Sequence, residues 1–188
     1  VLSKIACHDP KDSTSIRKEN YDYTKHISRS KDLKGIKIGV PKEYFRNSDK
    51  KVEKSVWGAI NKMESLGAVC KAISLPNTKY ALSSYYIIAT AEASTNLARY
   101  CGMRYGLHQE LEGSFNEYFS RVRSAGFGEE AKRRIILGTF ARMSGYRDAY
   151  YLKAMKVRTL IINEFKKAFK SFDVLAAPTM PIQPPKFS

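Results

Sequence analysis

Serines and cysteines that could attack an amide bond occur along this sequence, but none lies in a recognisable catalytic motif. A nucleophilic hydrolase needs an activated hydroxyl or thiol beside a base, with hydrogen-bond donors placed for the oxyanion. The sequence contains no G-x-S-x-G elbow and no glycine-rich serine loop. Ser83 and Ser84 open a tyrosine-rich stretch without neighbouring glycines. The motifs therefore assign no catalytic residue to this chain.

The histidines and cysteines do not indicate a metal site. His8, His26 and His108 have no histidine or cysteine partner at i+3 or i+4, so we interpret each as a surface residue. The three cysteines are too widely spaced for a zinc site or a disulfide framework. Cys101 has basic neighbours that could lower its thiol pKa, but we favour a thiol packed at a helix end. Glycine-rich nucleotide loops are also absent, so no cofactor is expected in this chain.

The elements that must position the remaining side chains indicate a layered α/β unit. Residues 36–40 alternate apolar and polar, as a strand does, and Pro41 ends them. Apolar positions recur at three and four from Asp49 to Leu66, which predicts a helix closed by Gly67. A second strand is expected over 68–73. Strand, helix and strand with short connections predict a largely parallel sheet flanked by helices.

Helices dominate the rest of the predicted chain. Residues 82–100 contain a single acid, Glu92, so we expect that helix to be buried around most of its circumference and Glu92 to need a partner. Residues 111–125 read as an amphipathic helix, and Glu129 starts the next one. A long last helix is expected over 144–169, followed by a short buried strand over 172–177.

The composition is that of one folded domain with an excess of basic residues. A length of 188 residues with 43% hydrophobic residues suits a single domain with its own core. The net charge of +15 favours a nucleic-acid or acidic-membrane partner, but lysines on solvated helix faces explain it as well. Neither an apolar run of about 18 residues nor a signal sequence is present. We expect a soluble, cytoplasmic protein, organellar if its source is a eukaryote, without a membrane partner.

Six strings occur in one order along nearly the whole chain. They are residues 8–15 (HDPKDSTS), 37–45 (KIGVPKEYF), 92–100 (EASTNLARY), 126–140 (GFGEEAKRRIILGTF), 156–160 (KVRTL) and 172–181 (FDVLAAPTMP). In this order they resemble the A subunits of glutamyl-tRNA(Gln) amidotransferases, which belong to the amidase-signature enzymes. The resemblance implies an α/β fold with a large mixed sheet flanked by helices, of which residues 1–188 form a partial amidase domain.

By the same resemblance, residues 1–34 form an irregular surface segment and residues 35–188 the half that shapes the substrate pocket. The two serines and the lysine that catalyse in the family precede the matching region, and its Gly-Gly-Ser-Ser-Gly-Gly-Ser type loop is missing here. We therefore expect this chain to be inactive by itself. No capping element follows the strand at 172–177, so further sequence is expected beyond residue 188.

The resemblance also implies a substrate site at Tyr85 and Arg134, which match family positions that contact glutamine. A guanidinium pairs bidentately with a carboxylate such as that of an amino acid. Periodicity does not distinguish Arg134 from Arg133, and an ion pair of Arg134 with Glu92 is the structural alternative. Tyr85 is either a substrate ligand or a core aromatic. Arg158 is a weaker candidate that is also placed to pair along its own helix.

The activity that the resemblance implies is release of ammonia from glutamine, which converts misacylated Glu-tRNA(Gln) to Gln-tRNA(Gln). Its partners would be amidotransferase subunits B and C, and the partner subunit would use ATP and Mg²⁺. Two alternatives remain open: a segment of another amidase-signature amide hydrolase, or a non-catalytic basic RNA-binding module. Cys101, Arg142 and Arg147 depart from the residues usual at these positions.

Overall fold

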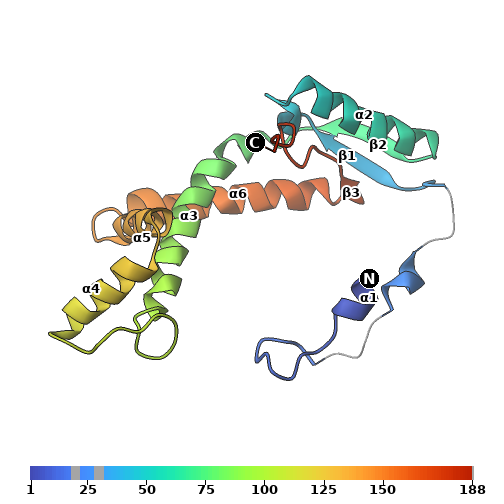
Figure 1. Ribbon diagram of the computed structural model, residues 1–188. Helices are drawn as coiled ribbons and strands as arrows, with labels where there is room; N and C mark the ends of the chain where they lie inside the picture. The colour runs from blue at the N-terminus through green and yellow to red at the C-terminus, as the bar shows by residue number, and fades with distance from the viewer. Residues whose placement is uncertain (18–21, 28–31, 188) are drawn as a thin grey trace.

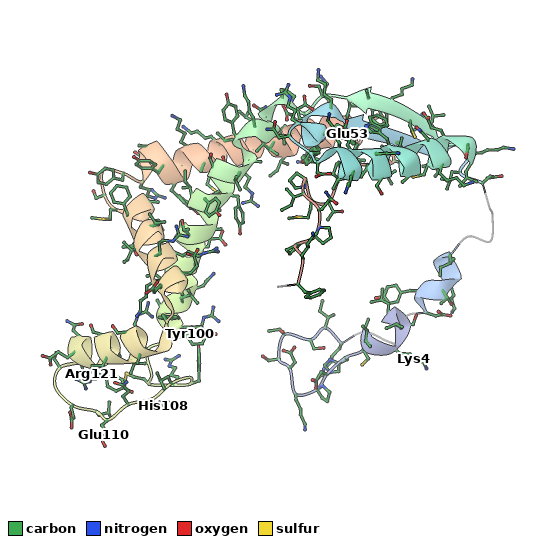
Figure 2. All side chains as sticks on the ribbon, turned by 45° about the horizontal axis from the view of Figure 1, so that its top comes forward. Lys4, Glu53, Tyr100, His108, Glu110 and Arg121 are labelled. Atoms are coloured by element: carbon green, nitrogen blue, oxygen red, sulfur yellow. The ribbon has the colours of Figure 1, made fainter. Side chains whose placement is uncertain are left out.

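The computed structural model describes residues 1–17, 22–27 and 32–187. Figure 1 shows a small sheet with helix α2 (Lys50–Ser65) at one end of the molecule and a group of helices extending from it. We call these helices, from α3 (Ala81–Asn96) to α6 (Lys153–Ala168), the helical arm. The N-terminal segment lies apart from both, and Lys4 on α1 (Leu2–Ile5) marks it in Figure 2. Among the described residues, no helix is long and apolar enough to cross a bilayer.

The sheet consists of three parallel strands in the order β2-β1-β3. They are β1 (Lys37–Pro41), β2 (Val69–Ile73) and β3 (Val174–Leu175). Ile38 of β1 pairs with Cys70 on one side and with Val174 on the other. The α/β class and both long strands are confirmed, and every described pairing is parallel.

Helix α2 (Lys50–Ser65) covers one face of this sheet and completes the core. Its first turn begins at Asp49, whose carboxylate accepts a hydrogen bond from the Lys51 amide at 2.7 Å. Gly67 ends the helix region with a φ of 100°, a conformation that favours glycine. Ile38 and Ile60 are each 1% exposed, and burying such a side chain contributes about 1.5–3 kcal/mol.

The helical arm contains α3 (Ala81–Asn96), α4 (Phe115–Gly126), α5 (Glu129–Arg142) and α6 (Lys153–Ala168). The short elements are α1 (Leu2–Ile5), the 3-10 turns η1 (Tyr23–His26), η2 (Lys42–Phe45), η3 (Pro76–Tyr80) and η4 (Leu97–Arg99), and the π-helical turn η5 (Asp148–Leu152). Helices α3 and α5 touch through their backbones: a Cβ on Gly138 would lie 1.9 Å from the carbonyl oxygen of Thr90. Glycine at this position therefore sets how closely the two helices approach.

Two helix predictions were wrong in detail. The last helix does not run continuously from 144, because Gly145 has a φ of 85° and the π-helical turn precedes α6. Helix α3 is not buried around most of its circumference: Leu82 is 67% exposed, and only Ser84, Thr90 and Ala91 are buried. Helices α5 and α6 cover only part of its circumference. Glu92 is exposed and needs no buried partner.

The N-terminal segment consists of turns closed by their own side chains. Asp9 accepts a hydrogen bond from the Lys11 amide at 2.9 Å, and Asp12 accepts one from the Thr14 amide at 2.8 Å. Residues 18–21 and 28–31, which the prediction of an irregular segment over 1–34 includes, lie outside the described residues. That division of the chain stays a prediction.

Candidate functional site

The candidate substrate residues Tyr85 and Arg134 lie on the two helices that cross at Gly138. Tyr85 belongs to α3 and Arg134 to α5. Helix α5 places Glu129 and Glu130 in its first turn, where carboxylates interact favourably with the positive end of the helix dipole. Arg134 follows Glu130 by four residues, so both side chains lie on one face of α5.

Glu130 binds Arg134 through the Nε atom of the guanidinium group. The Arg134 Nε donates to Glu130 Oε1 at 2.7 Å, and Arg133 donates to Oε2 of the same carboxylate at 2.5 Å. No described residue accepts a hydrogen bond from the two terminal nitrogens of Arg134. The Arg134 side chain is 43% exposed. Arg134 therefore still has its planar fork available for an incoming carboxylate.

The groups around Arg134 favour its charged form. The hydrogen bond to Glu130, and then the charge of that carboxylate, raise the pKa of Arg134, and the phenols of Tyr85 and Tyr86 raise it further. The pKa of Glu130 is lowered, first by the Arg134 hydrogen bond and then by that of Arg133. Arg134 thus stays cationic, and the phenols of Tyr85 and Tyr86 act on its charge. Its role as a ligand of glutamine stays a prediction. Its ion-pair partner is Glu130, so the expected alternative with Glu92 was wrong.

Tyr85 is a surface residue of α3 in this structure. It is 56% exposed, and its ring meets the edge of Tyr86 with 5.6 Å between centroids. Within the described part of this chain, Tyr85 is therefore not a core aromatic. Tyr85 lines a cavity of about 390 Å³ between α3 and α6, together with Glu92 and Arg158. Arg134 does not line this cavity, so the two candidate residues are neighbours on crossing helices without sharing one enclosed pocket.

The geometry supports Arg158 as a candidate substrate residue. The sequence offered an ion pair along α6 as its alternative role, but no ion pair of Arg158 with another described residue is present. It contributes a cation to the cavity of Tyr85, where Glu92 is the one acid in the lining. Sequence periodicity could not indicate this role, because Arg158 of α6 and the residues of α3 come together only in the folded helical arm.

The remaining polar candidates have structural roles. His8 lies 3.3 Å from Ser15 Oγ, which also accepts from the Asp9 amide and so closes an N-terminal turn. His108 Nδ1 lies 2.5 Å from the carbonyl oxygen of Gly102 and fixes that loop. The His26 side chain lies outside the described residues. Within the described ranges, no group of three or more acidic, histidine or cysteine side chains is placed to hold a metal ion.

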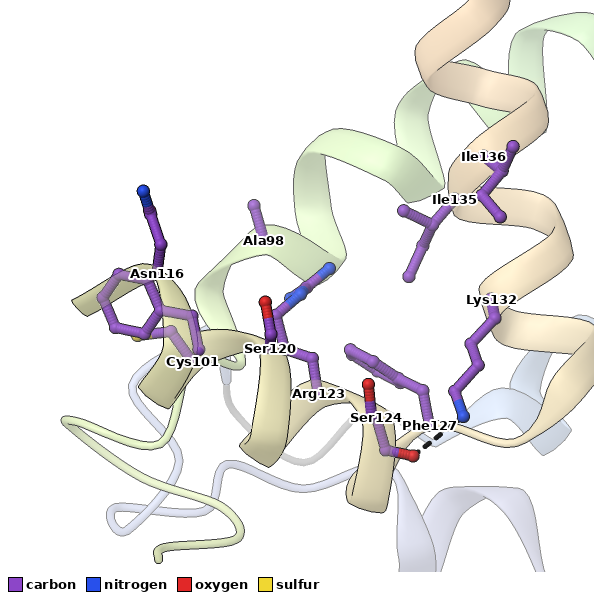
Figure 3. A pocket seen from close by; sticks show the side chains of 11 residues that line it. Ala98, Cys101, Asn116, Ser120, Arg123, Ser124, Phe127, Lys132, Ile135 and Ile136 are labelled. Atoms are coloured by element: carbon purple, nitrogen blue, oxygen red, sulfur yellow. Dashed lines mark hydrogen bonds between the residues drawn. The ribbon is translucent and has the colours of Figure 1, made fainter. Parts of the chain in front are cut away.

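A larger cavity, of about 810 Å³, lies between α4 and α5 (Figure 3). Phe127, Ile135 and Ile136 form part of its lining, and Lys132 donates to the Ser124 carbonyl oxygen at 2.8 Å at its edge. Cys101 lines it too and is partly buried. The prediction of Cys101 as a thiol packed at a helix end fits this position. Sequence reasoning missed the cavity, although the apolar residues of α5 were a signal for it.

Comparison with known proteins identifies the family. A family model described as Amidase matches residues 1–188. The A subunit of the glutamyl-tRNA(Gln) amidotransferase of Halothermothrix orenii is 52% identical over 182 residues, which cover 96% of this chain and 38% of that protein. Its counterpart in Carboxydothermus hydrogenoformans is 54% identical over 188 residues, 100% of this chain and 38% of that protein.

Two solved structures are similar to this chain. The glutamyl-tRNA(Gln) amidotransferase A subunit from Thermotoga maritima has a TM-score of 0.59 at 29% identity and is matched over 96% of this chain and 34% of its own. A bacterial aryl acylamidase of the amidase-signature family has a TM-score of 0.60 at 19% identity, with 97% and 34% covered, which concerns the fold alone. This chain thus spans well under half the length of its relatives. Because the family model matches it from end to end, the chain belongs to the Amidase family.

Proposed function

We propose that this chain is the glutamine-binding part of the amidase subunit of a tRNA-dependent amidotransferase. The relatives at 52% and 54% identity are both named as the A subunit of a glutamyl-tRNA(Gln) amidotransferase. The observation that carries the proposal is the arrangement of Arg134, whose Nε is held by Glu130 beside the phenols of Tyr85 and Tyr86.

The geometry fits the α-carboxylate of a small amino acid. The two terminal nitrogens of Arg134 form a planar fork that matches the two oxygens of a carboxylate, and such charge-assisted pairs are stronger than neutral hydrogen bonds. Glu130 keeps the fork oriented before substrate arrives, which lowers the entropy lost on binding. Tyr85 is exposed on α3, which packs against α5, and its phenol can donate or accept a hydrogen bond.

The chemical step requires residues that this sequence does not contain. In the proposed reaction a serine hydroxyl attacks the side-chain amide of glutamine, the C–N bond breaks, ammonia leaves, and water releases glutamate. The serine and its activating residues belong to polypeptide outside these 188 residues. The role of this chain is to bind glutamine and to fix the distance between its carboxylate and its amide.

The ammonia would be used by partner subunits B and C. In the proposed assembly, which works in the cytoplasm, the partner activates the misacylated Glu-tRNA(Gln) with ATP and Mg²⁺, and ammonia converts it to Gln-tRNA(Gln). The basic net charge of this chain would give a minor, salt-dependent attraction to the tRNA.

The test uses a chimeric subunit, in which this sequence replaces the matching 182 residues of the Halothermothrix orenii relative. Arg134→Lys should raise the KM for glutamine by about tenfold or more with little change in kcat, because an ammonium cannot reproduce the fork. Arg133→Lys is the matched control and should leave KM unchanged. Ammonia release is the measured quantity, and the 188-residue chain alone serves as the blank. Equal KM values for the wild-type chimera and Arg134→Lys would refute the proposal.

A further inference from the structure

A further cavity of the helical arm, of about 350 Å³, lies between α3 and the segment that joins α5 to α6. We call it the α3–η5 cavity, because η5 contacts both α3 and α5. Its lining contains Arg142, the last residue of α5, and Arg147, which directly precedes η5. Figure 1 shows the connecting segment far from the small sheet. Neither arginine belongs to the proposed glutamine site.

Both arginines have hydrogen-bond donors that no described residue uses. Arg142 donates through Nη1 to the Thr95 hydroxyl of α3, which holds its side chain against that helix. Neither Arg142 nor Arg147 forms an ion pair with a described residue. A guanidinium carries five N–H donors and no acceptor. Most of these donors are therefore available to an anion in the cavity.

Polar groups of α3 and of η5 complete the lining. The Thr95 hydroxyl, the Asn96 amide and the Tyr151 phenol can each donate a hydrogen bond to an anion. Ala91, which is 1% exposed, forms part of the wall. Glu92 is the one acid among the lining residues, and it makes no ion pair with the two arginines. The cations of the cavity are thus not neutralised by the chain itself.

The arrangement of these donors indicates the kind of anion. A planar carboxylate is satisfied by one guanidinium fork, whereas a phosphate group has three acceptor oxygens that point in different directions. Here Arg142 and Arg147 come from separate elements, and α3 offers a third set of donors. A volume of about 350 Å³ lies in the range of small-molecule sites, about 300–1,000 Å³. These features favour a tetrahedral anion on a small ligand.

We propose that the α3–η5 cavity binds the phosphate group of a small molecule, with Arg142 and Arg147 as its main ligands. By resemblance, both are positions at which this chain departs from the residues usual in its family. The site is therefore assigned to this chain and not to the fold in general. The inference does not depend on glutamine as the substrate.

The test measures binding of inorganic phosphate to the 188-residue chain by isothermal titration calorimetry, at low ionic strength in a phosphate-free buffer. The wild-type chain should bind one phosphate ion with a Kd of about 1 mM or lower. Arg142→Gln and Arg147→Gln should each weaken binding by about tenfold or more, because each removes charge-assisted hydrogen bonds. Glu92→Gln should strengthen binding by about threefold or more, because it removes the one negative charge of the lining.

Two controls separate the cavity from general effects of charge and folding. Arg46→Gln removes the same charge at the end of η2 and should bind phosphate as the wild type does. Arg46, Glu92, Arg142 and Arg147 are all exposed, so circular dichroism should show the wild-type helical content in every variant. Absence of saturable binding by the wild type, or equal binding by the wild type and Arg147→Gln, would overturn the inference.

Two further ligands test the class of the anion. Acetate should compete with phosphate only weakly; equal affinity for both would show that the site does not select a tetrahedral anion. A single-stranded RNA tetranucleotide should bind no more tightly than phosphate. Tighter RNA binding that is lost in Arg142→Gln and Arg147→Gln would assign the cavity to a nucleic acid and overturn the small-molecule assignment. Because no glutamine is present, failure of the proposed function would leave these results unchanged.

Discussion

At the scale of single residues, Glu130 is the side chain on which the site depends most. One carboxylate accepts hydrogen bonds from two consecutive arginines, at three and four residues along α5. The pairs are exposed, so their contribution to the stability of the fold is small. Their effect is on orientation: Arg134 is held by Nε, and its outer nitrogens are left for a ligand.

Glu130→Gln in the chimeric subunit should therefore raise the KM for glutamine by about fivefold while the melting temperature stays the same. The neutral amide holds Arg134 less firmly than the carboxylate does. Glu129→Gln, a change in the same helical turn, is the control and should have no effect. A lower KM in Glu130→Gln would mean that Glu130 competes with the substrate instead of orienting its ligand.

Part of this site could be predicted from the sequence. The resemblance to the family implied that Arg134 binds a carboxylate. Helical periodicity alone did not distinguish Arg134 from Arg133, because both have apolar neighbours on their side of the helix. The spacing of Glu130 and Arg134 was a readable i,i+4 signal for their ion pair that the prediction did not use. The proximity of Tyr85 could not be predicted by periodicity, because it depends on how α3 and α5 cross.

At the scale of elements, the crossing of α3 and α5 sets the geometry of the site. Gly138 allows the backbones to touch, with its Cβ position 1.9 Å from Thr90 O and 2.9 Å from Ala91 N. Both contacts are to backbone, so a side chain at 138 cannot be accommodated by a rotamer change.

Gly138→Ala should separate the two helices and destabilise the chimeric subunit by about 1–3 kcal/mol. In a protein of this size or larger, each kcal/mol lowers the melting temperature by about 2–4 °C. Gly58→Ala on α2 is the matched control: no atom lies within 4 Å of its Cβ position, and alanine favours a helix over glycine. A melting temperature for Gly138→Ala at or above that of the parent would show that the helices do not pack as described.

Glu43 joins η2 to the end of β2 and makes this connection sensitive to acid. It accepts hydrogen bonds from the Ser74 hydroxyl at 2.5 Å and the Leu75 amide at 2.9 Å. Burial raises its pKa, but these hydrogen bonds outweigh that effect, so the pKa of Glu43 is lowered from 4.5. A lowered carboxylate pKa stabilises the fold above the unfolded-state pKa, and this stabilisation is lost as the pH falls through the folded-state value.

The melting temperature should accordingly fall as the pH is lowered from about 5 to about 3, and Glu43→Gln should reduce that fall. Thermal unfolding at several pH values measures the difference between the parent chimera and the variant. Glu53→Gln on α2 removes the same charge without touching these hydrogen bonds and serves as the comparison. If the pH dependence of Glu43→Gln equals that of the parent, the two hydrogen bonds have no part in acid stability.

The elements themselves were largely predictable where local signals agreed. The strand at 36–40, the helix after Asp49 and its closure at Gly67 were confirmed, because alternation, capping and a left-handed glycine all favoured the same structure. Helix α3 was misjudged because its apolar sequence predicted burial that the described residues do not supply. The start of α6 was misjudged because the left-handed Gly145 was not recognised.

At the scale of the whole molecule, two features stand together: the large accessible surface of the chain and its short length relative to its family. The chain exposes 15016 Å², more than the about 9,100 Å² expected of a compact protein of its mass, and it spans 38% of the length of its curated relative from Halothermothrix orenii. The net charge of +15 is spread along the sequence and forms no recognised nucleic-acid motif. Contact with tRNA stays a prediction for the assembled enzyme.

The most direct test of the central claim compares glutamine with glutaminamide, in which the α-carboxylate is replaced by a neutral amide. If Arg134 binds that carboxylate, the chimeric subunit should prefer glutamine in kcat/KM by at least about tenfold, and Arg134→Ala should lose the preference. A preference for glutamine that is equally strong in Arg134→Ala would contradict the account, because the carboxylate would then be bound elsewhere.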